Sequence, residues 1–317
     1  MESNKSILLV GEPMGLFIAK SEGAFEDVDE YSVATCGAEL NVAIGLTRLG
    51  HRASYLTKLG PDPFGKRIVK QMKQEGIATD DILYDDTLRT GFMLKGSTSV
   101  GDPAIYYFRA GSAASTLSPT DVEGLDFSKF CAIHMTGITP ALSDSTRDLC
   151  RFLAAKAHEE DIFLSFDPNL RPQLWPSQEV MAHYINEFAA QCDLFLPGIA
   201  EGKILAGLED PVEIAAHYRE LGAGAVVVKV GGEGAYFDAG EEKGMVPGFH
   251  VSHVVDTVGA GDGFAAGVLS ARMEGLSWHD SVRRGNAIGA IQIMSVGDND
   301  GLPTREELAK FMLTDEH

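Results

Sequence analysis

The residues best suited to chemistry lie at positions 256–264, which read DTVGAGDGF. A glycine-rich turn there opens into an apolar helical segment at 265–273. Such a turn exposes several backbone N–H groups, and the helix dipole adds partial positive charge, so the segment predicts a cradle for phosphate oxygens. Asp262 falls in the first helical turn and is a natural general base for a hydroxyl nucleophile. An ordinary N-cap aspartate is the alternative, but two glycines between two acids favour function.

Two further glycine-rich segments compete as phosphate sites. Residues 60–67, GPDPFGKR, fit the P-loop spacing but lack the Ser or Thr that holds Mg²⁺, and two prolines remove N–H donors. We interpret them as a turn. Residues 229–234, KVGGEG, end a β-branched run, where they fit both a tight hairpin and a close approach to a nucleotide. No GxGxxG follows a strand, so hydride transfer is unsupported.

Polar residues also follow apolar strands at several places. Gly37 and Asn41 precede a helix, where Asn41 can make directional hydrogen bonds; a simple helix start is the alternative. Arg109 and Arg171 each follow an apolar run. A lone arginine there is usually a surface cation. Two of them in an acidic chain suggest bidentate binding of an anion.

From residue 130 onward, apolar strands alternate with amphipathic helices. Strands are predicted at 131–135, 162–166, 193–196 and 225–230, and helices at 145–158, 180–191 and 211–221. This alternation is typical of βαβ units. It predicts an α/β fold with a doubly wound, mostly parallel sheet.

The first third of the chain has a different pattern. Strands at 6–12 and 53–59 and helices at 39–49 and 64–74 continue the α/β body. Short pieces at 16–20, 89–95 and 104–109 alternate apolar and polar residues without helices between them. We expect a small antiparallel β lid, built discontinuously from about 13–35 and 89–111, in a single domain spanning 1–317.

Composition excludes several classes of function. Among 317 residues, 26 basic and 46 acidic side chains give a net charge of 26 − 46 = −20, which disfavours nucleic acid and anionic membranes as partners. Neither an 18-residue apolar run nor a signal-like N-terminus is present in the sequence. The four cysteines are far apart and form no CxxC pair, which fits free thiols and a cytoplasmic location.

Together these segments resemble the ribokinase-like family of carbohydrate kinases over residues 7–311. The resemblance is carried by residues 37–50 with Gly60 and Gly65, and by the specific motif DTVGAGD at 256–262. Within the family the chain is most similar to kinases of 2-keto-3-deoxygluconate, through GEPM at 11–14, YFR at 107–109 with GSAA at 111–114, DPNLR at 167–171 and GD at 297–298. Many members for neutral sugars carry an Asp near Met14. Its absence here favours a carboxylate substrate.

The resemblance implies a role for each matching residue. Asp262 would be the catalytic base, and Gly259, Ala260 and Gly261 the anion hole. Contacts to the sugar acid are implied for Gly37, Asn41, Tyr107, Arg109, Arg171 and Asp298. Contacts to the nucleotide are implied for Asn169, Lys229, Gly231, Gly234 and Asn286, with Asn169 between sugar and phosphates. Asp256 would organise a metal or monovalent-cation loop, and Glu201 would act on Mg²⁺. The implied cofactors are ATP and Mg²⁺, with a monovalent cation such as K⁺ as a further candidate.

Three residues depart from the family pattern. Cys36 replaces the first glycine of a usual pair, Gly198 stands where the family often has the Asn of Asn-x-x-Glu, and Met93 replaces a substrate-binding aromatic. The expected reaction is ATP-dependent phosphorylation of 2-keto-3-deoxygluconate at its 6-hydroxyl. A kinase for a neutral ketose such as fructose or tagatose, and a non-catalytic sugar-binding regulator, are the alternatives. Because the lid strands leave an apolar edge, we expect a homodimer.

Overall fold

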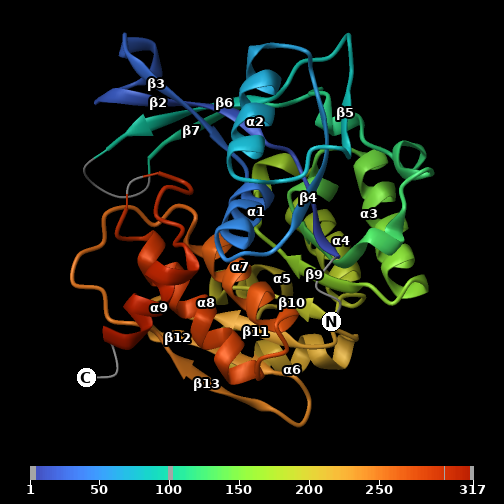
Figure 1. Ribbon diagram of the computed structural model, residues 1–317, viewed down its shortest axis with the longest axis vertical. Helices are drawn as coiled ribbons and strands as arrows, with labels where there is room; N and C mark the ends of the chain where they lie inside the picture. Colours follow the sequence, from blue (N-terminus) through green and yellow to red (C-terminus); the bar gives the residue numbers. More distant parts are fainter. Residues whose placement is uncertain (1–4, 99–102, 296, 315–317) are drawn as a thin grey trace.

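A nine-stranded, mostly parallel sheet forms the body of the computed structural model, which describes residues 5–98, 103–295 and 297–314 (Figure 1). Its order is β13-β12-β11-β10-β9-β8-β1-β4-β5, and only the β11–β12 and β12–β13 pairs are antiparallel. The strands are β1 (Ser6–Val10), β4 (Ala53–Leu59), β5 (Ile82–Tyr84), β8 (Phe130–Thr136), β9 (Phe163–Asp167), β10 (Leu194–Phe195), β11 (Val226–Lys229), β12 (Gly234–Asp238) and β13 (Lys243–Pro247). The predicted fold class is confirmed.

Helices cover both faces of this sheet because successive strand residues point to opposite sides. In β1, Ile7 and Leu9 pack in a core with α1, α2, α7, α8 and α9, whereas Leu8 and Val10 pack in a second core with α3, α4, α5 and α6. The helices are α1 (Ala38–Arg48), α2 (Pro63–Gln74), α3 (Asp144–Glu159), α4 (Gln178–Ala189), α5 (Ile199–Ala206), α6 (Pro211–Leu221), α7 (Ala260–Met273), α8 (Trp278–Gln292) and α9 (Arg305–Thr314).

A second, four-stranded sheet stands apart from the body, at the upper left of Figure 1. Its order is β3-β2-β6-β7, from β2 (Met14–Glu22), β3 (Tyr31–Cys36), β6 (Phe92–Ser97) and β7 (Ile105–Phe108). The outer pairs are antiparallel as expected, while the central pair β2–β6 runs parallel. The parallel pair follows from the topology, because the chain crosses the body through α1, β4, α2 and β5 before it returns to the lid.

Helices α1 and α2 begin within one residue of the predicted positions, whereas α7 begins at Ala260, five residues before the predicted helix at 265–273. Only residues 60–62 of the segment 60–67 form a turn, because α2 already begins at Pro63: Asp62 caps this helix by accepting from the backbone N–H groups of Phe64 and Gly65. The segment 229–234 is a short turn between the antiparallel strands β11 and β12. Within the residues that the structure describes, no helix is long and apolar enough to span a bilayer.

Candidate active site

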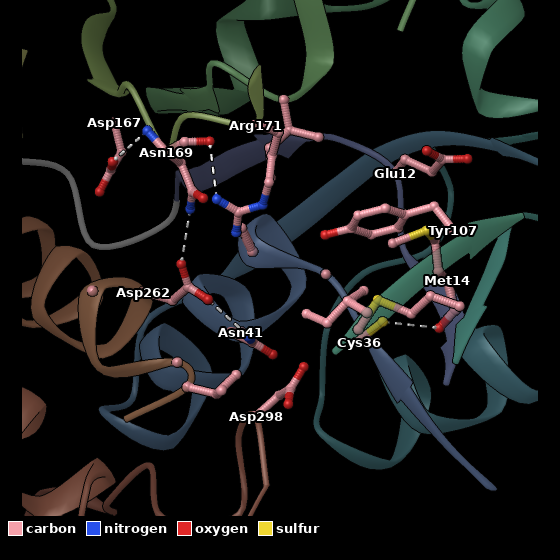
Figure 2. A pocket seen from close by; sticks show the side chains of 18 of the residues that line it. Glu12, Met14, Cys36, Asn41, Tyr107, Asp167, Asn169, Arg171, Asp262 and Asp298 are labelled. Carbon is pink, nitrogen blue, oxygen red and sulfur yellow. Dashed lines mark hydrogen bonds between the residues drawn. The ribbon is translucent and has the colours of Figure 1, made fainter. Parts of the chain in front are cut away.

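A cleft of about 360 Å³ lies between the lid sheet and the carboxyl ends of the parallel strands (Figure 2). This edge of an α/β sheet is where ligands usually bind. Residues from both sides line it: from the lid Met14, Cys36, Met93, Tyr107 and Arg109, and from the body Glu12, Asn41, Asp167, Asn169, Arg171, Glu201, Lys229, Asp262 and Asp298. All six residues predicted to contact the sugar acid line this one cleft.

Asp262 stands in the first turn of α7, as the sequence predicts, and two amide side chains orient its carboxylate. Asn41 Nδ2 donates to Oδ2 at 2.8 Å and Asn169 Nδ2 donates to Oδ1 at 3.3 Å. Burial raises the pKa of Asp262 to about 7, against the lowering effect of the Asn41 hydrogen bond. A carboxylate with a pKa near neutrality is suited to general base catalysis.

The orientation of the Asn41 amide is fixed from behind. Asn299 Nδ2 donates to Asn41 Oδ1 at 3.0 Å, so the Asn41 nitrogen is turned toward Asp262. Arg48 in turn donates to the backbone carbonyl of Asn299 at 3.0 Å. This chain of contacts links α1 and the segment after residue 296 to the Asp262 carboxylate.

The turn before Asp262 has the backbone geometry that the predicted anion cradle requires. Gly259 is the N-cap of α7 with a φ of 78°, and no described side chain caps this helix. The N–H groups at the helix start therefore face the cavities with the positive end of the helix dipole. A Cβ on Gly261 would meet only Lys229 Nζ, at 3.8 Å, so the glycine leaves room beside that ammonium.

A second cavity of about 670 Å³ adjoins the first and shares Lys229, Thr257 and Gly261 with it. The predicted nucleotide residues Gly231, Gly234 and Asn286 line it, as does Ala260. Its walls are mainly glycine backbone and apolar side chains: Gly232, Gly248, Phe249, Val251, Val254, Phe264, Ala290 and Ile293. This lining suits a flat heterocycle with a phosphate tail that reaches toward Gly261. Asn169 lines the first cavity, beside Asp262.

Lys229 lies where the two cavities meet and is held by two acids. Its Nζ donates to Asp167 Oδ2 at 2.6 Å, and charge from Asp167 and Glu201 raises the Lys229 pKa against the opposing effect of burial. Lys229 is therefore a fixed cation at the end of β11, beside the cradle, where a transferring phosphoryl group would pass.

Glu201 is the carboxylate best placed for a metal ion. It accepts from the backbone N–H groups of Leu170 at 3.0 Å and Gly198 at 2.8 Å, and burial raises its pKa. Gly198 thus serves as N-cap of α5 without the family asparagine. Among the residues described, no group of three or more His, Cys, Asp or Glu forms a cage. Mg²⁺ needs none, because it binds one or two carboxylates together with phosphate oxygens and water. Glu201 with Asp167 fits that donor set.

Asp256, the other predicted metal residue, contacts protein groups outside the two cavities. It lines neither cavity, and its Oδ2 accepts from Lys95 at 3.2 Å while its Oδ1 accepts from the Val258 N–H at 3.1 Å. The residue does organise the loop before Gly259. In the structure, the negative charge of Asp256 is balanced by Lys95 of the lid.

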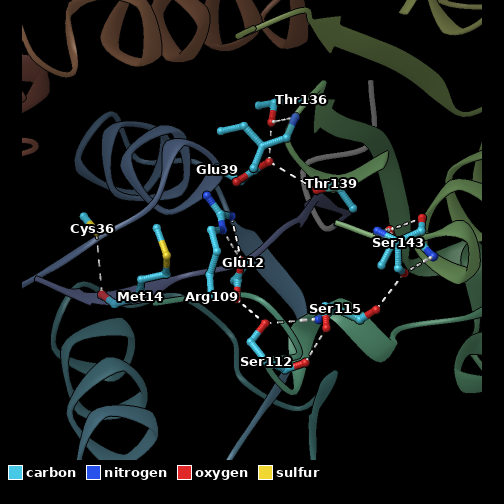
Figure 3. A network of polar contacts seen from close by, with 12 residues as sticks. Glu12, Met14, Cys36, Glu39, Arg109, Ser112, Ser115, Thr136, Thr139 and Ser143 are labelled. Carbon is cyan, nitrogen blue, oxygen red and sulfur yellow. Dashed lines mark hydrogen bonds and ion pairs between the residues drawn. The ribbon is translucent and has the colours of Figure 1, made fainter. Parts of the chain in front are cut away.

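The two arginines have different surroundings. Arg109 is buried, and its guanidinium contacts Glu12 Oε2 at 2.6 Å (Figure 3). It also lies over the face of Tyr107. Arg171 donates to the carbonyls of Asn169 and Leu170 at 3.3 and 2.8 Å. In Figure 2 its guanidinium lies between Asp262 and Tyr107. Arg171 therefore presents positive charge to the cleft, whereas the charge of Arg109 is largely balanced by Glu12.

Sequence reasoning missed several charged residues of the site. Glu12 lines the cleft just after β1, Asp167 lines it as the last residue of β9, and Glu39 lies beneath it, accepting from Thr136 at 2.6 Å (Figure 3). The positions of Glu12 and Asp167 in the sequence could have indicated them, because both stand at the ends of strands that meet at the same sheet edge. Burial raises the pKa of Glu39. No sequence signal indicated Lys95.

The chain is similar over most of its length to several known proteins. The family described as pfkB family carbohydrate kinase matches residues 4–305. The 2-dehydro-3-deoxygluconokinase of Bacillus subtilis (strain 168) is 46% identical over 303 residues, covering 95% of this chain and 94% of that protein. The enzyme of the same name from Thermoproteus tenax is 31% identical, with 98% and 95% covered. The crystal structure of a PfkB protein from Polaromonas sp. JS666 superimposes with a TM-score of 0.89 at 41% identity, covering 96% of this chain and 99% of that one.

Proposed function

The chain belongs to the pfkB family of carbohydrate kinases, and from that premise we propose that it transfers the γ-phosphate of ATP to the 6-hydroxyl of 2-keto-3-deoxygluconate. The observation that carries the substrate is the 46% identity, over nearly the whole chain, to a kinase of that name, since 2-dehydro and 2-keto describe the same compound. The ribokinase-like resemblance is thereby confirmed.

Asp262 would accept the proton of the 6-hydroxyl. Its carboxylate is held by Asn41 and Asn169 at the start of α7, so the base is oriented before substrate binds. The alkoxide would then attack the γ-phosphorus in line, with the leaving ADP in the second cavity. Because phosphoryl transfer needs little covalent help, positioning and electrostatics supply most of the rate acceleration.

Negative charge that develops on the phosphoryl group would be met from two sides. The backbone N–H groups around Gly259, Ala260 and Gly261 form one side, and Lys229 forms the other. Mg²⁺ bound with the nucleotide would supply positive charge that neutralises part of the phosphate charge. Glu201 and Asp167 are the residues that would hold it.

Arg171 and Tyr107 would recognise the sugar acid, with Asp298 and Gly37 at the far wall of the cleft. The guanidinium of Arg171 is suited to a bidentate contact with the substrate carboxylate. Arg109, which also lines the cleft and is paired with Glu12, would hold Tyr107 and the lid edge in place.

Two further properties belong to this proposal. We expect the enzyme in the cytoplasm, where ATP is present and where the four cysteines, which are free in the structure, stay reduced. We also expect it to be a homodimer through the lid. The neutral ketoses are the competing substrates, because hydroxyl groups too can accept from arginine.

The proposal is tested by coupled ADP release with Mg-ATP across 2-keto-3-deoxygluconate, gluconate, fructose, tagatose and ribose. The expected result is a clear preference for the keto-deoxy acid. A preference for fructose or tagatose would overturn the substrate but keep Asp262 and the fold. No activity with any of the five, together with intact ATP binding, would favour the sugar-binding regulator.

A further inference from the structure

We infer that Lys95 is a tethered cation that fastens the lid to the phosphate-binding loop and so positions that loop for catalysis. Lys95 lies on β6 and is only 6% exposed. Its Nζ is 3.2 Å from Asp256 Oδ2 and 3.7 Å from Asp298 Oδ1. The two carboxylates come from segments that flank the anion cradle, 161 and 203 residues away in sequence (256 − 95 and 298 − 95).

The contact reaches the cradle through Asp256. While its Oδ2 faces Lys95, its Oδ1 accepts from the Val258 N–H at 3.1 Å, one residue before Gly259. Lys95 therefore holds the Asp256 carboxylate in place, and this carboxylate in turn holds the loop backbone at Val258. A shift of Asp256 would move the N–H groups that are directed at the transferring phosphoryl group.

The second carboxylate is coupled to the same loop. Gln292 Nε2 donates to the carbonyls of Val258 at 3.2 Å and Gly297 at 2.8 Å, so the loop and the 297–298 segment are held side by side. Asp298 also lines the substrate cleft. Asp298 is buried and Asp256 is partly buried, and two such carboxylates that share one nearby cation repel each other more strongly when that cation is removed.

Lys95 also links this support to substrate binding. Met93 lies two residues earlier on β6, on the same face of the strand, and lines the substrate cleft. A sugar that contacts Met93 therefore presses on the same strand whose ammonium already holds Asp256. The family resemblance places Asp256 in a loop that binds a monovalent cation. In this structure the Lys95 ammonium neutralises the Asp256 carboxylate instead. Turnover should therefore not require added K⁺.

The test compares wild type, Lys95→Met and Lys20→Met in ADP release, with chloride salts of K⁺, ammonium or tetramethylammonium at equal ionic strength. Met keeps the length of the side chain and removes its charge. Lys20 is the control, since it lies on lid strand β2, is exposed and pairs only at the surface with Glu30. The inferred role of Lys95 concerns phosphoryl transfer and rests on the proposed kinase activity. The assay therefore uses whichever sugar of the panel reacts best.

The expected result has three parts. Wild type has equal turnover in the three salts. Lys95→Met loses roughly 10- to 100-fold in kcat, which is less than the roughly 10²- to 10³-fold loss for a group that contacts the transition state directly. K⁺ or ammonium, but not tetramethylammonium, restores part of it in a saturable way. Lys20→Met behaves as wild type. Rescue by a small cation separates a positioning charge from a merely structural side chain.

Three outcomes would overturn the inference. One is a Lys95→Met enzyme within about twofold of wild type in the tetramethylammonium salt. Another is a folded Lys95→Met enzyme whose lost turnover no cation restores. The third needs no variant: a wild-type enzyme that loses most of its turnover when tetramethylammonium replaces K⁺ does not obtain this charge from Lys95.

Discussion

At Asp262, burial and hydrogen bonding act on the pKa in opposite directions, and burial prevails, raising it to about 7. The active form of a general base is the ionised one, so activity is gained as pH rises through this pKa. We predict that kcat/KM falls about tenfold per pH unit below pH 7 and levels off above it. Asp262→Asn should lower kcat on the order of 10²- to 10⁴-fold, as expected for a lost general base, and should abolish that limb.

Asn41→Leu makes the sign of this effect testable, because the Asn41 hydrogen bond lowers the Asp262 pKa. Its removal should move the acidic limb of the pH–rate profile to higher pH. Stopped-flow or coupled assays from pH 5.5 to 9 measure the shift. A profile that is flat across this range in wild type, or a limb that moves to lower pH in Asn41→Leu, would contradict the assignment.

The two arginines should respond differently to substitution. Arg171→Lys removes the planar fork but keeps the charge, so we expect KM for the sugar acid to rise by roughly tenfold, with KM for ATP little changed. Arg109→Met leaves the buried Glu12 carboxylate without its ion pair. Breaking such a pair typically costs about 3–5 kcal/mol, so this variant should show a clearly lowered Tm.

Steady-state kinetics and thermal unfolding of the Arg171→Lys and Arg109→Met variants distinguish a role in substrate binding from a role in stabilising the fold. The assignment fails if Arg171→Lys weakens ATP and leaves the sugar acid unaffected. It also fails if Arg109→Met keeps the wild-type Tm, because the Arg109–Glu12 contact would then contribute little to the fold.

At the scale of the element, the start of α7 has two glycines with different requirements. Gly259 has a φ of 78°, and a Cβ there would overlap the carbonyl oxygen of Asp298. Gly261 lies in the helix with open space beside it. We predict that Gly261→Ala keeps or slightly raises Tm, because Ala favours helix over Gly by up to about 1 kcal/mol. Its methyl group should nevertheless lower kcat by roughly 10²-fold by intruding on the anion cradle.

Gly259→Ala should lower both Tm and kcat, since the loop must move. Gly124→Ala is the matched control: its Cβ would meet no atom within 4 Å, and it lies outside both cavities. Differential scanning fluorimetry with coupled kinetics distinguishes the three. Wild-type turnover in Gly261→Ala would show that the phosphoryl group passes elsewhere.

The same element shows what sequence can supply. The motif at 256–262 predicted a helix start, an aspartate in its first turn and an anion cradle, because all three depend on residues close in sequence. Lys95 and Asn299 reach the site only through folding, across 161 residues to Asp256 and 258 residues to Asn41. Local periodicity contains no information about such contacts. The parallel pairing of β2 with β6 was missed for the same reason.

At the scale of the whole molecule, alternating strands and helices predicted the layered sheet, because both periodicities are local. The order of the strands in the sheet depends instead on how the chain crosses from one strand to the next, which local periodicity does not show. Strand β1 ends up between β4 and β8, and β8 follows it by more than a hundred residues. The cleft therefore combines residues from both ends of the chain. Glu12 and Asp298 line one cavity although 286 residues separate them (298 − 12).

The lid presents an exposed apolar edge, and this edge supports a prediction about assembly. On edge strand β7, Ile105, Tyr106 and Phe108 are 43%, 57% and 46% exposed, and Phe108 stacks on Phe92 at 4.5 Å. Edge strands with apolar side chains tend to pair with another chain. Two copies meeting lid to lid would cover this surface with twofold symmetry.

We therefore predict a dimer mass by multi-angle light scattering at micromolar protein, and a shift toward monomer in Tyr106→Lys, because a lysine at the interface must be desolvated beside its symmetry mate. Tyr84→Lys is the matched control, since Tyr84 is 56% exposed but lies on β5 at the far edge of the body sheet. It should remain a dimer. A wild-type monomer, or equal dissociation of both variants, would place the contact outside the lid. Because the lid also closes the cleft, the Tyr106→Lys monomer should bind the sugar more weakly while its affinity for ATP, bound by the body, changes little.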